Sequence, residues 1–235
     1  MKIIKNQTKK IICQNIIDFC IILNSMKYLS YNTANKIRKD ILTSNSIKDF
    51  VFFPGKNNIL ISVPHGVSQT RLGKHKVAEI GTIPLGVMIA QETSSNLIVK
   101  TKNCFDDANF DKECPYRKFI KKLIAERNIK YIIDLHGLAG WRDCDINLGI
   151  NFGNNVKQNL VIYDKLYKSL KQHFNLAIDL PFKASTKTIS GFFAENFGVW
   201  TIQIETNCRI TNSRANIEKF NLLIKLITDW LNKIK

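Results

Sequence analysis

The sequence has few cysteines, prolines and glycines, the residues that form disulfide bonds or flexible linkers between domains. Its six cysteines form no C-x-x-C pair and show no regular spacing, which argues against a zinc ribbon and against a disulfide-stapled secreted scaffold. No Pro- or Gly-rich linker interrupts it. We therefore expect reduced cysteines, a cytoplasmic protein and no second catalytic or binding domain.

Long apolar runs are also missing. No stretch approaches the ~18 consecutive apolar residues of a membrane span, so a membrane partner is not expected. Residues 1–26 begin basic and then become apolar, but Gln14, Asn15 and Asp18 interrupt them and no small-x-small cleavage site follows. A packed helix is therefore favoured over an export signal. Nucleophile-elbow, P-loop and dinucleotide fingerprints are absent, so serine hydrolase, NTPase and Rossmann oxidoreductase functions have no motif in support.

Acidic residues are heavily outnumbered. The 35 Lys and Arg against 19 Asp and Glu give a formal net charge of +16. Such an excess is typical of proteins that bind anions or nucleic acid. The lysines are spread among many Asn and Ile residues, and no helix-turn-helix or RNA-binding motif accompanies them. The charge therefore favours a small anionic substrate over nucleic acid, and it does not specify an oligomeric state.

What the sequence does contain is an alternation of strand-like and helix-like segments. Residues 1–50 are predicted to form a helical extension of two helices, broken near 31–33, that packs on a main domain of residues 51–235. In that domain we predict strands at 59–63, 96–101, 129–137, 145–152 and 200–207, and helices at 82–93, 116–128, 156–174 and 215–235. This alternation predicts a three-layer α/β/α fold with a mostly parallel or mixed sheet.

Two of the four histidines stand where predicted strands end. His65 lies in "SVPHG" and His136 in "DLHG", each followed by a glycine that lets backbone approach closely. Because the carboxyl ends of parallel strands share one edge, we expect both imidazoles to face a common cavity. Asp134 shares a strand face with His136 and would fix the tautomer of a metal-binding histidine. His75 and His173 have no comparable setting.

A divalent metal ion would need a third protein ligand and an open position. Glu79, in "KVAEIGTIPLG", lies just ahead of the predicted helix at 82–93. A carboxylate at a helix N-terminus is the alternative interpretation of Glu79. Rival acidic ligands, whose alternative role is to cap loop turns, are Asp106, Asp107 and Asp111.

Glu205 lies on the polar face of the predicted strand 200–207, near its carboxyl end. A half-buried carboxylate needs a partner. One hypothesis is a structural ion pair with Arg209. The other makes Glu205 the general base that takes a proton from a metal-activated water, which leaves Arg209 free to bind a substrate carboxylate. Arg142 is a second candidate for anion binding.

The motifs "SVPHG", "AEIGT", "DDANFD", "DLHG" and "IQIETNCR", in this order, resemble the N-formylglutamate amidohydrolase family. That family is related in fold to the zinc carboxypeptidases and aspartoacylases. The resemblance covers about residues 58–232. It implies a phosphorylase/hydrolase-like α/β fold, one zinc ion, and hydrolysis of an amide next to a carboxylate.

By match of motif, the resemblance makes His65 and His136 the zinc-binding histidines, Glu79 the acidic ligand and Glu205 the catalytic carboxylate. The family usually has an Asn-Arg pair in the segment that matches "DDANFD", where the arginine binds the substrate carboxylate. In this sequence Asn109 is followed by phenylalanine. The missing contact would have to come from Arg117, Arg142 or Arg209.

These observations predict a zinc-dependent amidohydrolase that acts on a small N-acyl amino acid, N-formylglutamate-like, or on a related carboxylate-bearing substrate. Two alternatives stay open. One is a metallopeptidase of the carboxypeptidase-like superfamily. The other is a non-catalytic member of this fold that binds anions or nucleic acid through its lysines.

Overall fold

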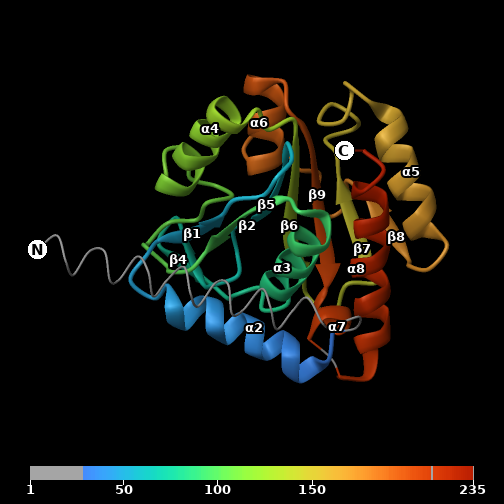
Figure 1. Ribbon diagram of the computed structural model, residues 1–235, viewed down its shortest axis with the longest axis horizontal. Coiled ribbons are helices and arrows are strands. Elements are labelled where there is room, and N and C mark those ends of the chain that lie inside the picture. The colour runs from blue at the N-terminus through green and yellow to red at the C-terminus, as the bar shows by residue number, and fades with distance from the viewer. Residues whose placement is uncertain (1–28, 213, 235) are drawn as a thin grey trace, which may run out of the picture.

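The computed structural model describes residues 29–212 and 214–234, and a seven-stranded sheet forms its middle layer (Figure 1). The sheet strands are β1 (Phe50–Phe53), β2 (Ile59–Val63), β5 (Asn96–Lys100), β6 (Tyr131–Leu138), β7 (Ile146–Gly149), β8 (Leu176–Ile178) and β9 (Trp200–Asn207). Their spatial order is β1-β5-β2-β6-β9-β7-β8. A separate hairpin consists of β3 (Gln69–Arg71) and β4 (Lys74–Lys76).

The centre of the sheet is parallel and its margins are mixed. β5, β2, β6 and β9 pair in parallel, whereas β1 runs antiparallel to β5 and β7 antiparallel to β9. Every residue of β2, β5 and β9 is buried, which is typical of parallel strands that helices cover on both faces. The predicted mixed α/β sheet is therefore confirmed.

Two hydrophobic clusters lie between the sheet and the helices that cover its two faces. The helices are α2 (Tyr31–Ser44), α3 (Thr82–Thr93), α4 (Pro115–Arg127), α5 (Leu160–Lys171), α6 (Ile189–Phe197), the short α7 (Cys208–Thr211) and α8 (Ile217–Leu231). The larger cluster joins one face of the sheet to α2, α3, α5 and α8. The smaller one joins the opposite face to α4 and α6. The three-layer α/β/α prediction is thus confirmed.

Only the second helix of the predicted N-terminal extension can be described. The first falls in residues 1–28, which lie outside the described residues. α2 begins at Tyr31 because the side chain of Ser30 accepts a hydrogen bond from the Thr33 amide, a standard N-cap. Buried Ala34, Ile37 and Ile41 then pack into the larger hydrophobic cluster. α2 is therefore part of the same hydrophobic core as the sheet.

The structure corrects the start of one predicted helix. α5 begins at Leu160 rather than at 156, and the Asn159 side chain caps it by accepting a hydrogen bond from the Ile162 amide. Residues 151–158 form turns, and the positive φ of Asn151, Phe152 and Gly153 also ends the strand predicted at 145–152 early, so that β7 stops at Gly149. The elements that the sequence patterns did not predict are short, namely β1, β3, β4, β8, α6 and α7.

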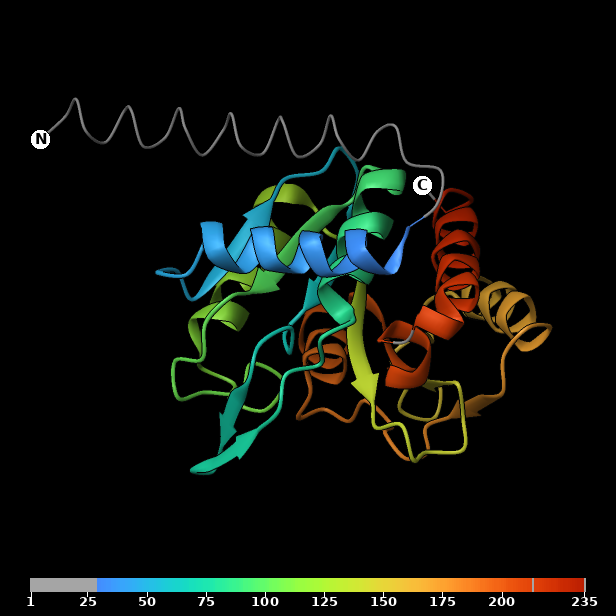
Figure 2. The same cartoon turned by 90° about the horizontal axis from the view of Figure 1, so that it is seen from below.

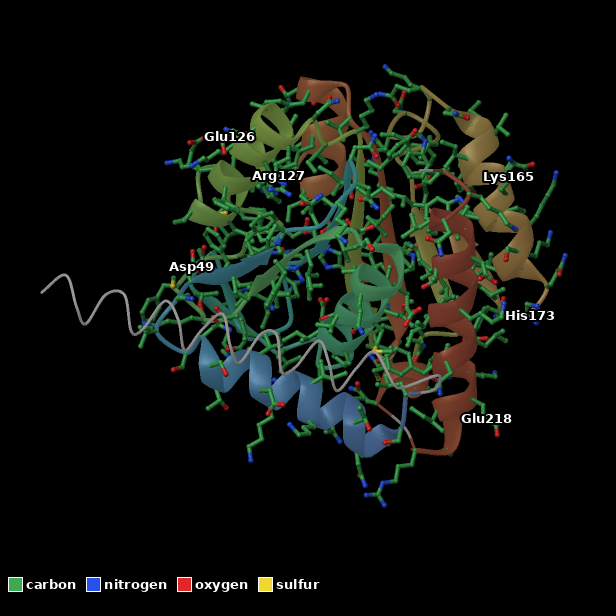
Figure 3. The ribbon with its side chains drawn as sticks, in the orientation of Figure 1. Asp49, Glu126, Arg127, Lys165, His173 and Glu218 are labelled. Carbon is green, nitrogen blue, oxygen red and sulfur yellow. The ribbon has the colours of Figure 1, made fainter. Side chains whose placement is uncertain are left out.

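No helix in the described ranges combines the length and the apolar character that crossing a bilayer requires. The four cysteines among those residues are free thiols. His173 lies on the outer surface beyond α5, away from the sheet (Figure 3).

A buried lysine joins three chain segments at one margin of the sheet. Lys100 ends β5, its side chain has no exposed surface, and its Nζ donates to both carboxylate oxygens of Asp106, at 2.7 and 2.8 Å. It also donates to Asp49, which lies just before β1 (Figure 3). Burial lowers the pKa of Lys100, but its hydrogen bonds to the two carboxylates outweigh this effect and the net pKa is raised. The loop at 101–114 is thereby fixed to the sheet.

We predict that Lys100→Met lowers the free energy of unfolding by about 3–5 kcal/mol, because it leaves two largely buried carboxylates without their cation. Urea unfolding monitored by circular dichroism measures this. The control is Lys36→Met, which removes an exposed ion pair with Asp40 on α2 and should cost less than ~1 kcal/mol. Equal losses in the two variants would contradict the structural role of Lys100.

Candidate metal centre

Three side chains from distant parts of the sequence converge at the carboxyl edge of β2 and β6. His65 lies two residues beyond β2, His136 lies inside β6, and Glu79 lies in the segment that leads into α3. The Glu79 amide donates to the His65 carbonyl at 2.8 Å, and the Gly137 amide donates to Glu79 Oε2 at 2.8 Å. Backbone contacts therefore fix the position of the acidic side chain relative to both histidines.

The glycine after each histidine makes this approach sterically allowed. A Cβ atom on Gly66 would stand 2.4 Å from the side chain of Ile83 at the start of α3. A Cβ atom on Gly137 would stand 3.0 Å from the Cβ of Glu79. Larger residues at either position would push α3 or Glu79 away from the histidines.

The Nδ1 atom of each imidazole, called the inner nitrogen here, faces the Glu79 carboxylate. His65 Nδ1 is 2.8 Å from Glu79 Oε1, and His136 Nδ1 is 3.4 Å from Glu79 Oε2. The two Nδ1 atoms are 3.1 Å apart, and the rings meet edge to face. Both imidazoles are buried. Each of these three residues therefore presents one potential ligand atom to the same point.

The outer nitrogen of each imidazole faces a carboxylate that is fully buried. His65 Nε2 lies 2.8 Å from Asp107 Oδ1, and His136 Nε2 lies 3.2 Å from Asp134 Oδ2. A carboxylate in this position accepts the Nε2–H hydrogen bond, so the neutral ring keeps a lone pair on Nδ1. Asp134 stands where the strand pattern predicted. Asp107, a rival ligand on the sequence, contacts the outer side of His65 instead.

This donor set fits a zinc ion. When both Nε2 protons are directed to the carboxylates, two Nδ1 lone pairs and the Glu79 carboxylate converge, and either a proton or a metal ion between them would stabilise the arrangement. Ligands ~2.1 Å from a tetrahedral ion stand about 3.4 Å from one another. The observed separations are 2.8, 3.1 and 3.4 Å, so one equals that value and the other two are shorter and would have to lengthen around the ion. Two imidazoles and one carboxylate are also a known ligand set of catalytic zinc.

The electrostatics of the centre favour a positive charge. Burial lowers the pKa of His136, but Asp134 and Glu79 outweigh burial and raise the net pKa well above its ordinary value. Burial raises the pKa of Glu79, but the two histidines outweigh burial and hold the net pKa below its usual range. Glu79 thus stays ionised beside the two imidazoles, and a divalent cation would be stabilised at this position.

Glu205 stands beside this cluster on the next strand. It is the register partner of His136 in the β6–β9 pairing, and only 4% of its surface is exposed. Its Oε1 accepts a hydrogen bond of 2.6 Å from Gln203 Nε2. Burial raises the pKa of this carboxyl to about 7. The alternative of a Glu205–Arg209 ion pair is not seen, because Arg209 is exposed and its Nη2 donates to the Arg142 carbonyl at 2.9 Å.

Several solved structures have a fold similar to that of this chain. No family model and no curated protein sequence matches the chain. A gene product of Agrobacterium tumefaciens superposes with a TM-score of 0.62 at 12% identity, over 85% of this chain and 100% of the other. N-formylglutamate amidohydrolase from Ralstonia eutropha superposes with a TM-score of 0.53 at 13% identity, over 79% and 96% of the two chains. The chain has the fold of N-formylglutamate amidohydrolase.

A bacteriophage poly-γ-glutamate hydrolase has the same fold. It superposes with a TM-score of 0.50 at 12% identity, over 79% of this chain and 89% of the other. The fold that the sequence motifs implied is therefore shown, and at these identities the likeness concerns the fold alone.

In this N-formylglutamate amidohydrolase fold, one open cleft of about 930 Å³ is lined by the central cluster, which consists of His65, Glu79, His136 and Glu205. Of the predicted substrate-binding residues, Asn109 and Arg142 line this cleft. Asn109 is held in place because its Oδ1 accepts a hydrogen bond of 2.8 Å from the Ile189 amide. Arg117 and Arg209 do not line it. Arg117 is fully buried and donates to the carbonyls of Ala108 and Lys187, each at 2.7 Å.

Arg71 lines the cleft although the sequence analysis gave it no role. Its Nε donates to Asp107 Oδ2 at 2.7 Å, on the carboxylate that also contacts His65. The signal in the sequence was weak, because β3 and β4 have three residues each and their turn uses Leu72 and Gly73, both at positive φ. Leucine is not a usual residue for such a turn.

If the cluster holds zinc, we predict that His65→Ala and His136→Ala each lower zinc affinity by more than ~100-fold, because each would remove a primary ligand rather than an outer carboxylate. Zinc content after dialysis and competition with a chelating dye measure this. The control is His75→Ala, a histidine that also lines the cleft and should leave zinc affinity unchanged. Full zinc content in both ligand variants would exclude these two histidines as ligands.

We expect Asp107→Asn to weaken zinc binding by ~10–100-fold without abolishing it, because the amide no longer favours the His65 tautomer with a free Nδ1. The same dye competition provides the measurement. Asp143→Asn, at an exposed aspartate of the loop after β6, serves as the matched control. An unchanged affinity in Asp107→Asn would mean that this carboxylate does not orient the histidine.

Proposed function

We propose that the protein is a zinc-dependent amidohydrolase that cleaves an amide next to a carboxylate, in a small N-acyl amino acid of the N-formylglutamate kind. The observation that carries the proposal is the convergence of two imidazole Nδ1 atoms and the Glu79 carboxylate beside Glu205 in one cleft. Two similar structures support it by their names, an N-formylglutamate amidohydrolase and a poly-γ-glutamate hydrolase.

His65, His136 and Glu79 would hold a single zinc ion. Such an ion lowers the pKa of a bound water toward ~7 and polarises the amide carbonyl. Asp107 and Asp134 keep the two Nδ1 atoms free of protons by accepting from the outer nitrogens. The cleft brings the amide to these residues.

Glu205 is the proton carrier in this proposal. It takes a proton from the water that attacks the carbonyl carbon, and it passes that proton to the nitrogen of the leaving amine. The C–N bond then breaks to give a carboxylate and an amine. Gln203 holds the Glu205 carboxylate in place through its hydrogen bond of 2.6 Å. Glu205 is well placed for this role because its strand pairs in register with the strand of His136.

Two alternatives make different experimental predictions. A metallopeptidase would cleave short peptides faster than N-acyl amino acids, so the two substrate classes are offered side by side. A non-catalytic anion-binding or nucleic-acid-binding protein would be isolated without zinc, and its binding would weaken steeply with added salt.

We predict that Glu205→Gln keeps its zinc and loses at least ~100-fold in kcat, because the amide is nearly isosteric but cannot carry the proton. Zinc content and hydrolysis of N-formyl-L-glutamate, followed by release of glutamate, give the two readouts. Glu195→Gln, an exposed glutamate on α6, is the matched control. Undiminished turnover in Glu205→Gln would remove this residue from the mechanism.

A further inference from the structure

The acidic residues that line the cleft belong to the central cluster, and the basic residues lie around it. The two acidic residues are Glu79 and Glu205. The basic residues are Arg71, Lys76, Arg142, Lys183 and Lys187. Surface lysines are abundant on this protein, so they carry little information individually. The two arginines are different, because neighbouring side chains contact both guanidinium groups.

A buried carboxylate, that of Asp107, holds the Arg71 side chain in place. Arg71 Nε donates to Asp107 Oδ2 at 2.7 Å, and Asp107 has no exposed surface. Its guanidinium lies over the ring of Phe110, 5.2 Å from the ring centroid. Among the described residues, neither terminal nitrogen has a hydrogen-bond partner, and 32% of the side chain is exposed. Arg71 can therefore offer its two Nη atoms to an anion in the cleft.

The guanidinium of Arg142 contacts two partly exposed aromatic rings. It lies 4.2 Å from the ring centroid of Trp141 and 5.6 Å from that of Phe182. The Arg142 backbone carbonyl accepts hydrogen bonds from Asn207 Nδ2 at 3.1 Å and from Arg209 Nη2 at 2.9 Å. No carboxylate in the described part of the chain pairs with it. A stacked guanidinium without a carboxylate partner is preorganised to bind an anion bidentately.

The two arginines are attached to opposite sides of the metal centre. The central strand order is β5-β2-β6-β9, and the histidines belong to the β2 exit and to β6. Arg71 is bonded to Asp107 in the loop after β5, whereas Arg142 is held by Asn207 at the end of β9. Figure 2 shows the β3–β4 hairpin and the loop after β6 extending from the same edge of the sheet, on its two sides.

We propose that the cleft selects amides that carry a negatively charged group on each side of the bond to be cut, with Arg71 and Arg142 each binding one of these groups. This inference rests on the proposed function and adds that the preferred substrates are acidic acyl derivatives of acidic amino acids and acidic peptides, whereas N-formylglutamate, charged on one side of its amide only, binds more weakly. A formyl group is too short and has no charge to engage a second arginine. Binding at both ends fixes the amide between the arginines, at the central cluster.

The test compares three ligands that differ in the position of their carboxylates. N-glutaryl-L-glutamate is charged on both sides of the amide, N-pentanoyl-L-glutamate only on the amine side, and N-pentylglutaramic acid only on the acyl side. Binding is measured by calorimetry to the zinc-loaded Glu205→Gln variant, in which hydrolysis should be at least ~100-fold slower. We expect the first ligand to bind at least ~10-fold more tightly than either of the others, because it alone forms both guanidinium–carboxylate pairs.

Arginine variants in the same background assign the two contacts. We expect Arg71→Gln to remove the advantage of one carboxylate and Arg142→Gln to remove that of the other, each by ~10–100-fold. Lys74→Gln, on the same hairpin but outside the cleft lining, should change nothing. Because Arg71 also contacts Asp107, zinc content is measured in every variant, and Arg71→Lys keeps a positive charge next to that carboxylate.

The outcomes separate this inference from the proposed function. Equal binding of the glutaryl and pentanoyl ligands, or two arginine variants that affect the same carboxylate, would overturn the inference even if N-formylglutamate is hydrolysed. Selective binding of the doubly charged ligand by a protein that hydrolyses none of these amides would uphold the two-sided anion site and reject the hydrolase.

Discussion

The candidate metal centre depends on the imidazoles of His65 and His136, whose Nδ1 atoms face each other at 3.1 Å. In the tautomers that place both Nε2 protons toward Asp107 and Asp134, two Nδ1 lone pairs at that distance repel each other, and the Glu79 carboxylate adds negative charge beside them. The buried carboxylates on the outer side of each ring, Asp107 and Asp134, keep the inner nitrogens available as acceptors. A cation would relieve this repulsion, so the same contacts that orient the rings also make the cluster a candidate metal site.

The fold supports this cluster through a continuous set of ionic contacts. Lys100 at the end of β5 holds Asp106, and the next residue, Asp107, contacts both His65 and Arg71. The loop at 101–114 therefore has two charged attachments, one to the sheet and one to the candidate site. Because Asp107 is fully buried, a displacement of this loop would alter the orientation of His65 and the position of Arg71 together.

Much of the site could be predicted from local patterns. His65 and His136 follow apolar strands and precede glycines, and Asp134 and Glu205 lie at positions whose strand face follows from a period of two residues. The arginines were harder to place, because an arginine can reach in many directions from a loop. Arg117 proved to be buried against backbone carbonyls, and Arg71 came from a hairpin too short and too polar to be recognised.

The sequence by itself determined the alternation of strands and helices, the edge at which the histidines emerge, and the face of the sheet that carries Glu205, because each follows from spacing within a single element. Only the tertiary structure decided that Glu79 contacts both histidines and that Asp107 contacts the outer nitrogen of His65. It also decided that Arg71 and Arg142 line one cleft and are attached to strands on opposite sides of the histidines. These relations join segments far apart in the sequence, so they depend on strand order and loop packing rather than on any local pattern.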